Sequence, residues 1–326
     1  MSNANFSTII ASTLQNFSNQ IMDNVITNNA VFYYMKQKGN YKVVSGGRSF
    51  VEQLWWRANP SFAARDDMDT ITPAVTDGHT ASEWAIKVIS GAIALPLLDV
   101  AMNSGSKEQL LNYAMAKKKE AETSLGQVMA AQLFNTAVVA ANGGGVNWNS
   151  IPEIISEDPS TETNTVGGIV GSTHSYWRNY SYDTAVSGFN TNQAGLIAIE
   201  TSLNSCTFGP AGPKLMVTTP AIFTLFQIAL TALQRYANMD EPGNIGFQRL
   251  TYANIPVVYD NNCIAGNLYG IDTEAVKLKV LSQGNFKNTP FQIKTDQLVD
   301  TALMYVFGNL ACDSRRSNFV IDSITA

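Results

Sequence analysis

Side chains that could carry catalysis are few in this chain and widely separated. The two histidines, His79 and His174, stand in no recognisable nucleophile-and-base arrangement. Ser104–Lys107 (SGSK) formally fits the Ser-x-x-Lys pattern of some acyl-transfer enzymes. It stands at the start of a helical sequence, where serine commonly caps the helix. We therefore interpret this motif as a helix start and not as a nucleophile.

Metal-binding and phosphate-binding patterns are also missing. Asp66, Asp67 and Asp69 could contact a divalent cation, but the glycine and glutamate of a calcium loop are absent, so a solvated turn fits better. Gly143–Gly145 lacks the Lys-Ser/Thr pair of a phosphate loop and indicates a linker. The three cysteines have no C-x-x-C spacing, which favours buried thiols in a reducing compartment. We expect no cofactor, no metal and no enzymatic activity.

The composition indicates a folded protein with an unusually uncharged surface. Apolar residues make up 45% of the 326 residues and charged residues only 14%, below the usual quarter. A surface rich in uncharged polar groups suits packing against copies of itself. The net charge of -5 argues against a dedicated nucleic-acid reader but leaves room for weak contact with a polyanion. The length suits one large or two medium domains.

Neither a signal peptide nor a membrane span is expected. The first basic residue is Lys36, so the positive start of a signal peptide is missing. The uncharged stretch from Leu215 to Gln234 contains Thr, Pro and Gln, and it divides into a short buried strand and a helix from about Pro220. These features favour a soluble cytoplasmic protein.

One long helix should organise the chain. From Ser106 to Asn135 there is no proline, and Ser106 and Gln109 have the spacing of a capping box. At 1.5 Å per residue such a helix is about 45 Å long, more than one compact core usually needs. Its apolar residues recur at helical spacing and form one stripe: Leu110, Leu111, Ala114, Met115, Ala121, Leu125, Val128, Met129 and Phe134.

Before this helix the pattern predicts a long β excursion. The sequence from Tyr41 to Pro96 contains two strand-like runs around a polar tip, with the large apolar side chains Phe50, Trp55, Trp56, Phe62 and Trp84. A two-stranded ribbon is marginal in water, so these side chains need a partner molecule unless the ribbon folds back on its own domain. Residues 1–30 likewise form an apolar stripe at helical spacing that needs a surface.

The order of these parts resembles the major capsid proteins of tailed bacteriophages, which have the Hong Kong 97-like fold. The stretches that carry the resemblance are MDNVITNNAVFYYMKQKG with GGRSFVEQLWW, the passage from ISGAIALPLLDV to GQVMAAQLFN, VGGIVGSTHSYWRNYS, LMVTTPAIFTLF with IPVVYDNNCIAGNLYGID, and GNLACDSRRSNFVIDSI. Each stretch is moderately specific, whereas their order is much more so. Together they cover nearly the whole chain.

The resemblance implies an α+β fold with four parts. They are an N-terminal arm (1–40), an extended β-hairpin loop (41–95), a peripheral domain (96–164 and 283–326) with its spine helix at 106–135, and an axial α/β domain (165–282). In that family the extended loop lies over the adjacent subunit. By position, the candidate intersubunit contacts are Trp55, Trp56, Arg65, Asp66, Asp67 and Asp69 in the loop, and Arg315 and Arg316 at the receiving domain or a local threefold.

The resemblance further implies a head-shell protein of the virion, assembled in the host cytoplasm. Its partners would be copies of itself in hexamers and pentamers, a separate scaffolding protein, a portal protein, packaged double-stranded DNA through weak non-specific contact and, as an open alternative, a decoration protein. No membrane is expected. We expect no lysine–asparagine cross-links, because Lys42 and Lys87 lie toward the base of the loop. An encapsulin-type compartment shell is the nearest alternative, and a soluble α/β enzyme is a more distant one.

Overall fold

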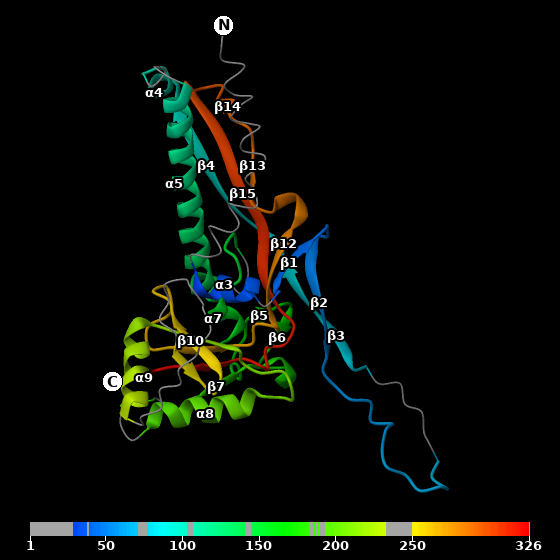
Figure 1. Ribbon diagram of the computed structural model, residues 1–326. Helices are drawn as coiled ribbons and strands as arrows, with labels where there is room; N and C mark the ends of the chain where they lie inside the picture. Colours follow the sequence, from blue (N-terminus) through cyan, green and yellow to red (C-terminus); the bar gives the residue numbers. More distant parts are fainter. Residues whose placement is uncertain are drawn as a thin grey trace.

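The computed structural model describes residues 29–37, 39–70, 77–102, 107–140, 145–182, 186, 188–189, 193–232 and 250–325. Two six-stranded sheets and a projecting two-stranded ribbon organise this part of the chain (Figure 1). Most of the expected N-terminal arm falls on residues 1–28, outside the described residues. The described remainder of the arm forms the helix α3 (Ala30–Gln37).

The two longest strands of the first sheet are neighbours. Strand β15 (Val299–Cys312) pairs antiparallel with β4 (Lys87–Pro96) along the whole length of β4. The other members are β1 (Tyr41–Val44), β12 (Val276–Leu281), β13 (Lys287–Asn288) and β14 (Gln292–Ile293). β15 is apolar and aromatic over most of its length, as expected for a strand covered by other elements.

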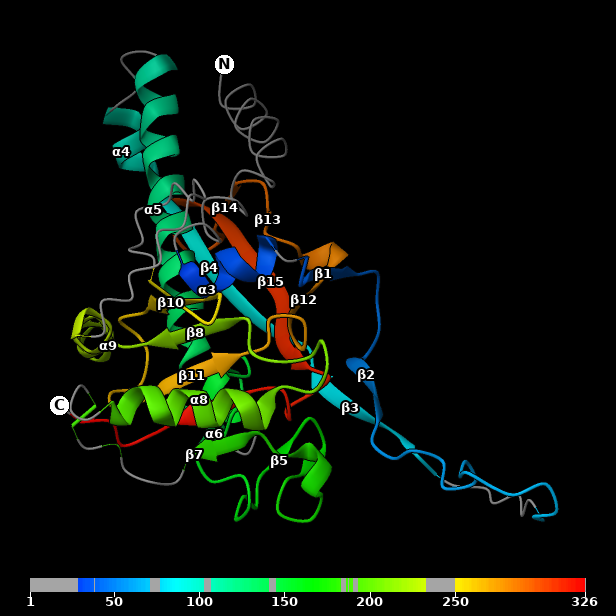
Figure 2. The ribbon, with the colours of Figure 1, turned by 60° about the horizontal axis from the view of Figure 1, so that its bottom comes forward.

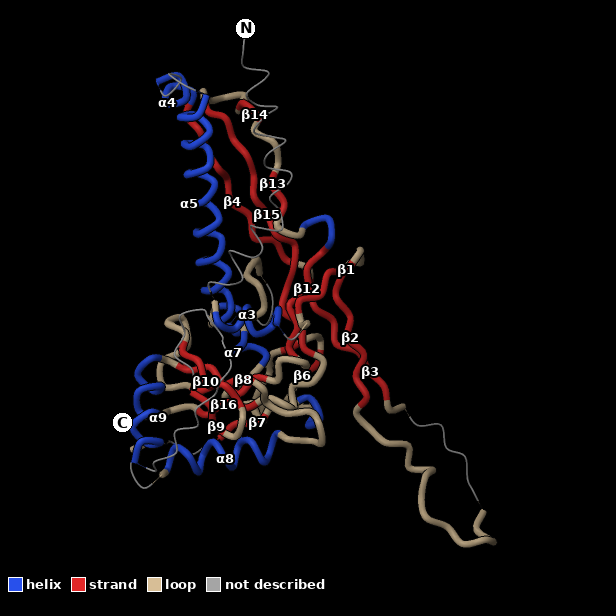
Figure 3. The backbone as a smooth tube through the Cα atoms, viewed as in Figure 1, coloured by secondary structure: helices blue, strands red, loops and turns tan. Residues whose placement is uncertain are grey.

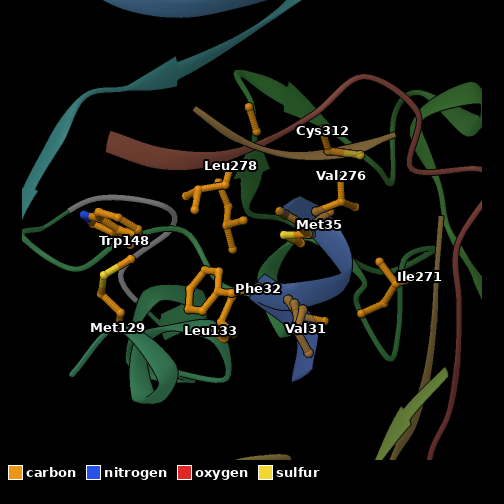
Figure 4. Close-up of a cluster of buried hydrophobic side chains, with 14 of the residues drawn as sticks. Val31, Phe32, Met35, Met129, Leu133, Trp148, Ile271, Val276, Leu278 and Cys312 are labelled. Carbon is orange, nitrogen blue, oxygen red and sulfur yellow. The ribbon is translucent and has the colours of Figure 1, made fainter. Parts of the chain in front are cut away.

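The long helix lies along this sheet. Helix α5 (Lys107–Leu133) runs beside β4 and confirms the helix that the sequence pattern predicts (Figure 1). The short α4 (Leu97–Met102) precedes it, and α6 (Ala137–Ala140) and α7 (Ile151–Ile154) follow it. At the foot of α5, Met129 and Leu133 meet Phe32 of α3 and Trp148 in a core with β12 (Figure 4). This core joins the helix, the arm's end and the sheet.

The second sheet forms a separate lobe with its own helices. Its strand order is β7 (Tyr180–Tyr182), β16 (Phe319–Ile321), β11 (Leu268–Ile271), β8 (Leu215–Thr218), β10 (Ile255–Tyr259) and β9 (Leu250–Tyr252). Helices α8 (Ala194–Cys206) and α9 (Pro220–Ala232) pack on it (Figure 2). The small hairpin β5 (Thr165–Val166) and β6 (Ile169–Val170) and the turn η1 (Ser175–Trp177) lie between this lobe and the ribbon.

The sheets divide the chain differently from the expected boundaries. β12 lies before residue 283 yet belongs to the first sheet, whereas β16 near the C-terminus belongs to the second. Strands β1 and β4, expected within the extended loop, pair instead with β12 and β15. The projecting ribbon is therefore β2 (Ser49–Trp55), β3 (His79–Ala85) and the described residues between them, 56–70 and 77–78 (Figure 3).

Candidate assembly surface

The ribbon has one buried face and one exposed face. Side chains alternate across a strand, and on β2 Phe50 and Leu54 are buried while Val51 and Trp55 on the other face are 54% and 73% exposed. Phe50 lies directly opposite Trp84 of β3, which is 1% exposed. For Phe50 and Trp84 the alternative left open by the sequence holds: this face of the ribbon packs on its own subunit, which covers both side chains.

Hydrogen bonds fix the ribbon's base to the subunit. The Trp84 indole Nε1 donates to Ser82 Oγ at 3.0 Å, and Ser82 Oγ donates to the carbonyl of Cys312 at 3.2 Å. The Glu83 amide donates to the carbonyl of Gly167 at 2.9 Å. These bonds leave the buried polar groups of this face with partners, as a stable packed face requires.

A charged cluster holds the same face of β2. The Lys279 Nζ lies 2.6 Å from Glu52 Oε1, and Lys277 Nζ lies 3.7 Å from Glu52 and 2.5 Å from Asp313 Oδ2. Burial alone would raise the pKa of Glu52, but the hydrogen bond from Lys279 and the charges of Lys277, Lys279 and Lys42 hold it below its ordinary value. Glu52 is therefore ionised at neutral pH and ties the ribbon to β12.

Beyond its strands the ribbon extends into an exposed tip. Phe62 and Met68 are 87% and 94% exposed, and nothing in the described chain covers them. Sequence reasoning named Phe62 but missed Met68, whose only signal is an apolar residue between aspartates. The tip runs away from both sheets in two views (Figures 1 and 2). Its exposed apolar side chains are available to another molecule.

The charged residues of the tip first shape the tip itself. Arg65 donates from Nη1 to the carbonyl of Thr70 at 3.1 Å and from Nη2 to that of Ser61 at 3.3 Å. The Asp66 amide donates to Asp69 Oδ2 at 3.1 Å, and the Asp67 amide donates to Asp66 Oδ1 at 2.9 Å. All these side chains remain exposed. The structure thus gathers the four charged candidates at one solvated turn, which gives them a local structural role.

The tip-side end of the ribbon's paired strands borders an aromatic groove. Trp56 stacks on Tyr176 with ring centroids 4.9 Å apart, and the Arg316 guanidinium lies 3.5 Å from the centre of the Phe208 ring. The groove has a volume of about 600 Å³ and is lined also by Trp55. Trp55, Trp56 and Arg316 are therefore brought together, although the sequence places Arg316 far from the other two.

Arg315 occupies a different environment from Arg316. Its side chain is 0% exposed, and the guanidinium pairs with Glu162 inside the subunit, with Nη1 2.8 Å from Oε2. Arg315 Nε also donates to the carbonyl of Ile154 at 2.6 Å. A side chain without exposed surface cannot make a direct contact with a second subunit. Arg315 is thus not an intersubunit contact, as the resemblance implies, but a member of an internal ion pair.

A second exposed apolar patch lies at the far end of the first sheet. Leu98 and Met102 of α4, Ile293 of β14 and Leu298 are 65% to 79% exposed. The Leu97 amide donates to the carbonyl of Leu298 at 3.0 Å, which joins the two segments at this end (Figure 1). Sequence reasoning missed this patch because its members come from two distant segments that only the fold brings together.

No group of three His, Cys, Asp or Glu side chains comes together to hold a metal ion within the described ranges. No described helix is long and apolar enough to cross a membrane. The features that stand out are thus surfaces: a ribbon with an uncovered face and tip, and an apolar patch at the opposite end.

Comparison with known proteins relates this arrangement to viral shells. No family model and no curated protein matches the chain. Among solved structures, the cyanophage A-1(L) capsid matches over 90% of this chain and 93% of its own, with a TM-score of 0.61 at 14% identity. The Hong Kong 97-like capsid fold is shown by this likeness.

Two further solved structures agree with it. A structure from Gordonia phage Cozz matches over 90% of this chain and 86% of its own, with a TM-score of 0.52 at 11% identity. The capsid of an empty GTA particle covers 88% and 89%, with a TM-score of 0.51 at 11% identity. The long helix α5, the ribbon and the two sheets are the elements that make up the Hong Kong 97-like fold of this chain.

Proposed function

We propose that this chain is the major capsid protein of a tailed double-stranded DNA bacteriophage and forms the icosahedral or prolate head shell as hexamers and pentamers. The observation that carries the proposal is the ribbon, whose outer face and tip expose Trp55, Phe62 and Met68. Large exposed apolar side chains on a projecting element mark a surface made for another protein. Further copies of the same chain are the partner that a shell requires.

In this proposal the two lobes have distinct places. The first sheet with α5 is the peripheral domain and the second sheet with α8 and α9 is the axial domain, around which rings close. The ribbon lies over a neighbouring subunit. Trp55 and the tip residues Arg65, Asp66, Asp67 and Asp69 provide that contact, while Trp56 and Arg316 line the groove at the tip-side end of the ribbon's strands.

The remaining partners belong to the same proposal. A separate scaffolding protein would guide assembly and a portal protein would occupy one vertex, while a decoration protein on the finished shell stays an open alternative. Double-stranded DNA would be enclosed through weak non-specific contact, in keeping with the net charge of -5. The protein would be assembled in the host cytoplasm and reside in the virion. Its role would be structural and not enzymatic.

Removing the ribbon beyond its strands tests the proposal. The Trp56 amide donates to the carbonyl of Gly78 at 3.1 Å, so the two legs are adjacent there and a two-residue Asn-Gly turn can replace residues 57–77. We expect the full chain to form rings or shells in sedimentation and negative-stain microscopy. The shortened chain should keep its circular dichroism spectrum and melting temperature but remain monomeric.

Two results would contradict the proposal. One is a full chain that sediments as a monomer at every concentration, and the other is normal shells from the shortened chain. Shells that enclose a bound enzyme in place of DNA would instead indicate the encapsulin-type alternative. Turnover of a substrate by the monomer would indicate the enzyme alternative.

A further inference from the structure

The ribbon joins the subunit at two points where strands change partners. On one leg, β3 pairs with β2 up to Ala85 and β4 pairs with β15 from Lys87, so the change occurs at Ile86. On the other leg, residues 45–48 separate β1 from β2, and Gly47 has a φ of +135°, a value that glycine adopts without strain. We call these two points the ribbon hinge, because the direction of the ribbon is set there.

A buried chain of hydrogen bonds reaches the hinge at Ala85. Asn309 Nδ2 donates to the carbonyl of Ala85 at 2.7 Å and also to Asn149 Oδ1. The backbone N–H of Asn149 donates to Asn309 Oδ1 at 2.7 Å. Asn149 Nδ2 then donates to both carboxylate oxygens of Glu153, at 2.8 Å each. The carbonyl of Ala85 at the hinge is thus connected, through the side-chain amides of Asn309 and Asn149, to the titratable carboxyl of Glu153.

This carboxyl lies in the interior. Glu153 is 3% exposed, and Asn309 and Asn149 are 0% and 5% exposed. Among the described residues, the charged groups that act on Glu153 are Lys87 on β4, directly after the hinge, and Arg315, which is itself paired with Glu162. Lys87 is 6% exposed, so the positive group that attracts Glu153 is buried too.

Burial dominates the acid–base chemistry of this cluster. Burial raises the pKa of Glu153 to about 7, although Lys87, Arg315 and the hydrogen bonds from Asn149 and Ser150 oppose the shift. Burial likewise lowers the pKa of Lys87, against the attraction of Glu153. For both Glu153 and Lys87, the loss of hydration on burial therefore outweighs their mutual electrostatic attraction.

We propose that the cluster of Glu153, Asn149 and Asn309 is a pH-sensitive latch on the ribbon hinge. In the closed state the cluster excludes water and holds Ala85, and with it the ribbon, in the observed direction. When the hinge opens, water reaches the carboxyl and stabilises its ionised form. The latch acts within one subunit; its use in moving the ribbon between neighbours rests on the proposed shell function.

The direction of the effect follows from proton linkage. The closed state binds the Glu153 proton more tightly, since its carboxyl has a pKa of about 7 there and an ordinary value of 4.5 when hydrated. Acid therefore favours the closed hinge, and the closed-to-open ratio falls as the pH rises from about 4.5 through 7. The full fall is on the order of 10²-fold.

Hydrogen–deuterium exchange of the full chain tests the latch. Exchange of peptides covering residues 83–92 would be followed between pH 5 and pH 8, each rate divided by the intrinsic rate at that pH. In the wild type we expect the corrected rate to rise about tenfold or more with pH, because opening becomes more frequent. Glu153→Gln should abolish this rise, since the amide does not titrate.

Glu52→Gln is the matched control. Glu52 holds the other leg of the ribbon and its pKa is low, so it stays ionised across this pH range. This variant should exchange faster in β2 at every pH and keep the rise with pH at the hinge. Asn309→Ser, which cuts the link between Ala85 and the carboxyl, should lose the rise while retaining Glu153.

A flat pH profile in the wild type would overturn the latch even if every variant failed to fold. An unchanged rise in Glu153→Gln would overturn it too, because another group would then be titrating. Neither readout depends on shell formation, so the outcome is separate from that of the proposed function.

Discussion

The Arg315 guanidinium lies inside the subunit against the Glu162 carboxylate, with Nη1 2.8 Å from Oε2 and Nη2 3.3 Å from Oε1. Arg315 Nη2 also donates to Asn179 Oδ1 at 3.3 Å, and its Nε donates to the carbonyl of Ile154. The segment after β15 is thereby fixed to α7 and to the chain before the second sheet. This internal pair replaces the intersubunit role that the sequence suggested for Arg315.

Removing one member of this pair should destabilise the subunit strongly. Arg315→Ala leaves the Glu162 carboxylate buried without its partner, and we expect the free energy of unfolding to fall by about 3–5 kcal/mol. The adjacent Arg316→Ala is the matched control, since Arg316 is exposed and loses only its contact with Phe208, worth about 0.5–1 kcal/mol. Urea unfolding followed by tryptophan fluorescence measures both. Equal, small losses would show that Arg315 is not an internal support.

Trp55 should matter for association and not for folding. Its side chain is 73% exposed on the outer face of the ribbon. We expect Trp55→Ala to leave the melting temperature unchanged and to weaken subunit association by about 2 kcal/mol, or ~30-fold. Trp84→Ala, on the buried face, should do the opposite and cost about 3–5 kcal/mol of stability. Sedimentation together with thermal unfolding separates the two effects, and unchanged assembly of Trp55→Ala would remove this residue from the interface.

The charged cluster at Glu52 should make stability depend on acid. The pKa of Glu52 is held below its ordinary value of 4.5, so this group stabilises the fold above that pH and loses its contribution as the pH falls through the folded-state pKa. At pH 7 Glu52→Gln should be less stable than the wild type by about 1 kcal/mol. This difference should shrink as the pH falls through the folded-state pKa of Glu52, because the wild-type carboxyl then becomes protonated.

Glu83→Gln provides the comparison for Glu52. Glu83 lies on the exposed face of the paired strand and accepts a hydrogen bond from Ser49 Oγ at 2.6 Å. We expect little change in the urea midpoint for this variant at pH 7. A loss as large as that of Glu52→Gln would mean that any ribbon carboxylate has the same effect, against the specific role of Lys277 and Lys279.

Local patterns predicted the elements better than their partners. Helix α5 followed from its apolar stripe and lack of proline, because a helix is built from contacts close in sequence. The sequence did not predict that β12 belongs to the first sheet and β16 to the second. The alternation of apolar and polar residues along a strand does not specify which strand it pairs with. For this reason the expected domain boundary between residues 282 and 283 does not coincide with the division of the chain between the two sheets.

The candidate contact residues show the same limit. Arg315 and Arg316 are neighbours in sequence, and the family resemblance makes both of them candidate intersubunit contacts by position alone. Arg315 meets Glu162, which is 153 positions away along the chain, and only the fold brings the two together. Trp55 and Trp84 carry equally large apolar side chains, and which of them is covered depends on the face that the ribbon turns to the subunit.

The cysteines should be unreactive in the folded protein. Burial raises the pKa of Cys206 and Cys263 to about 12, and it raises that of Cys312 as well. The thiolate is the reacting form, so we expect no labelling by iodoacetamide at pH 8 in the native state. In guanidinium all three thiols should react, as counted by intact mass. Rapid labelling of the native chain would show that this interior opens readily.

Two glycines in strands should respond oppositely to an added methyl group. A Cβ at Gly270 of β11 would lie 2.0 Å from the Phe319 ring, whereas one at Gly91 of β4 would meet no atom within 4 Å. Phe319 is 0% exposed and cannot move aside freely, so Gly270→Ala should cost about 1–3 kcal/mol. Gly91→Ala should be neutral or stabilise by about 0.4–1 kcal/mol, because it restricts the unfolded chain. Urea midpoints compare the pair, and a neutral Gly270→Ala would mean that β11 and β16 pack less closely than this structure has them.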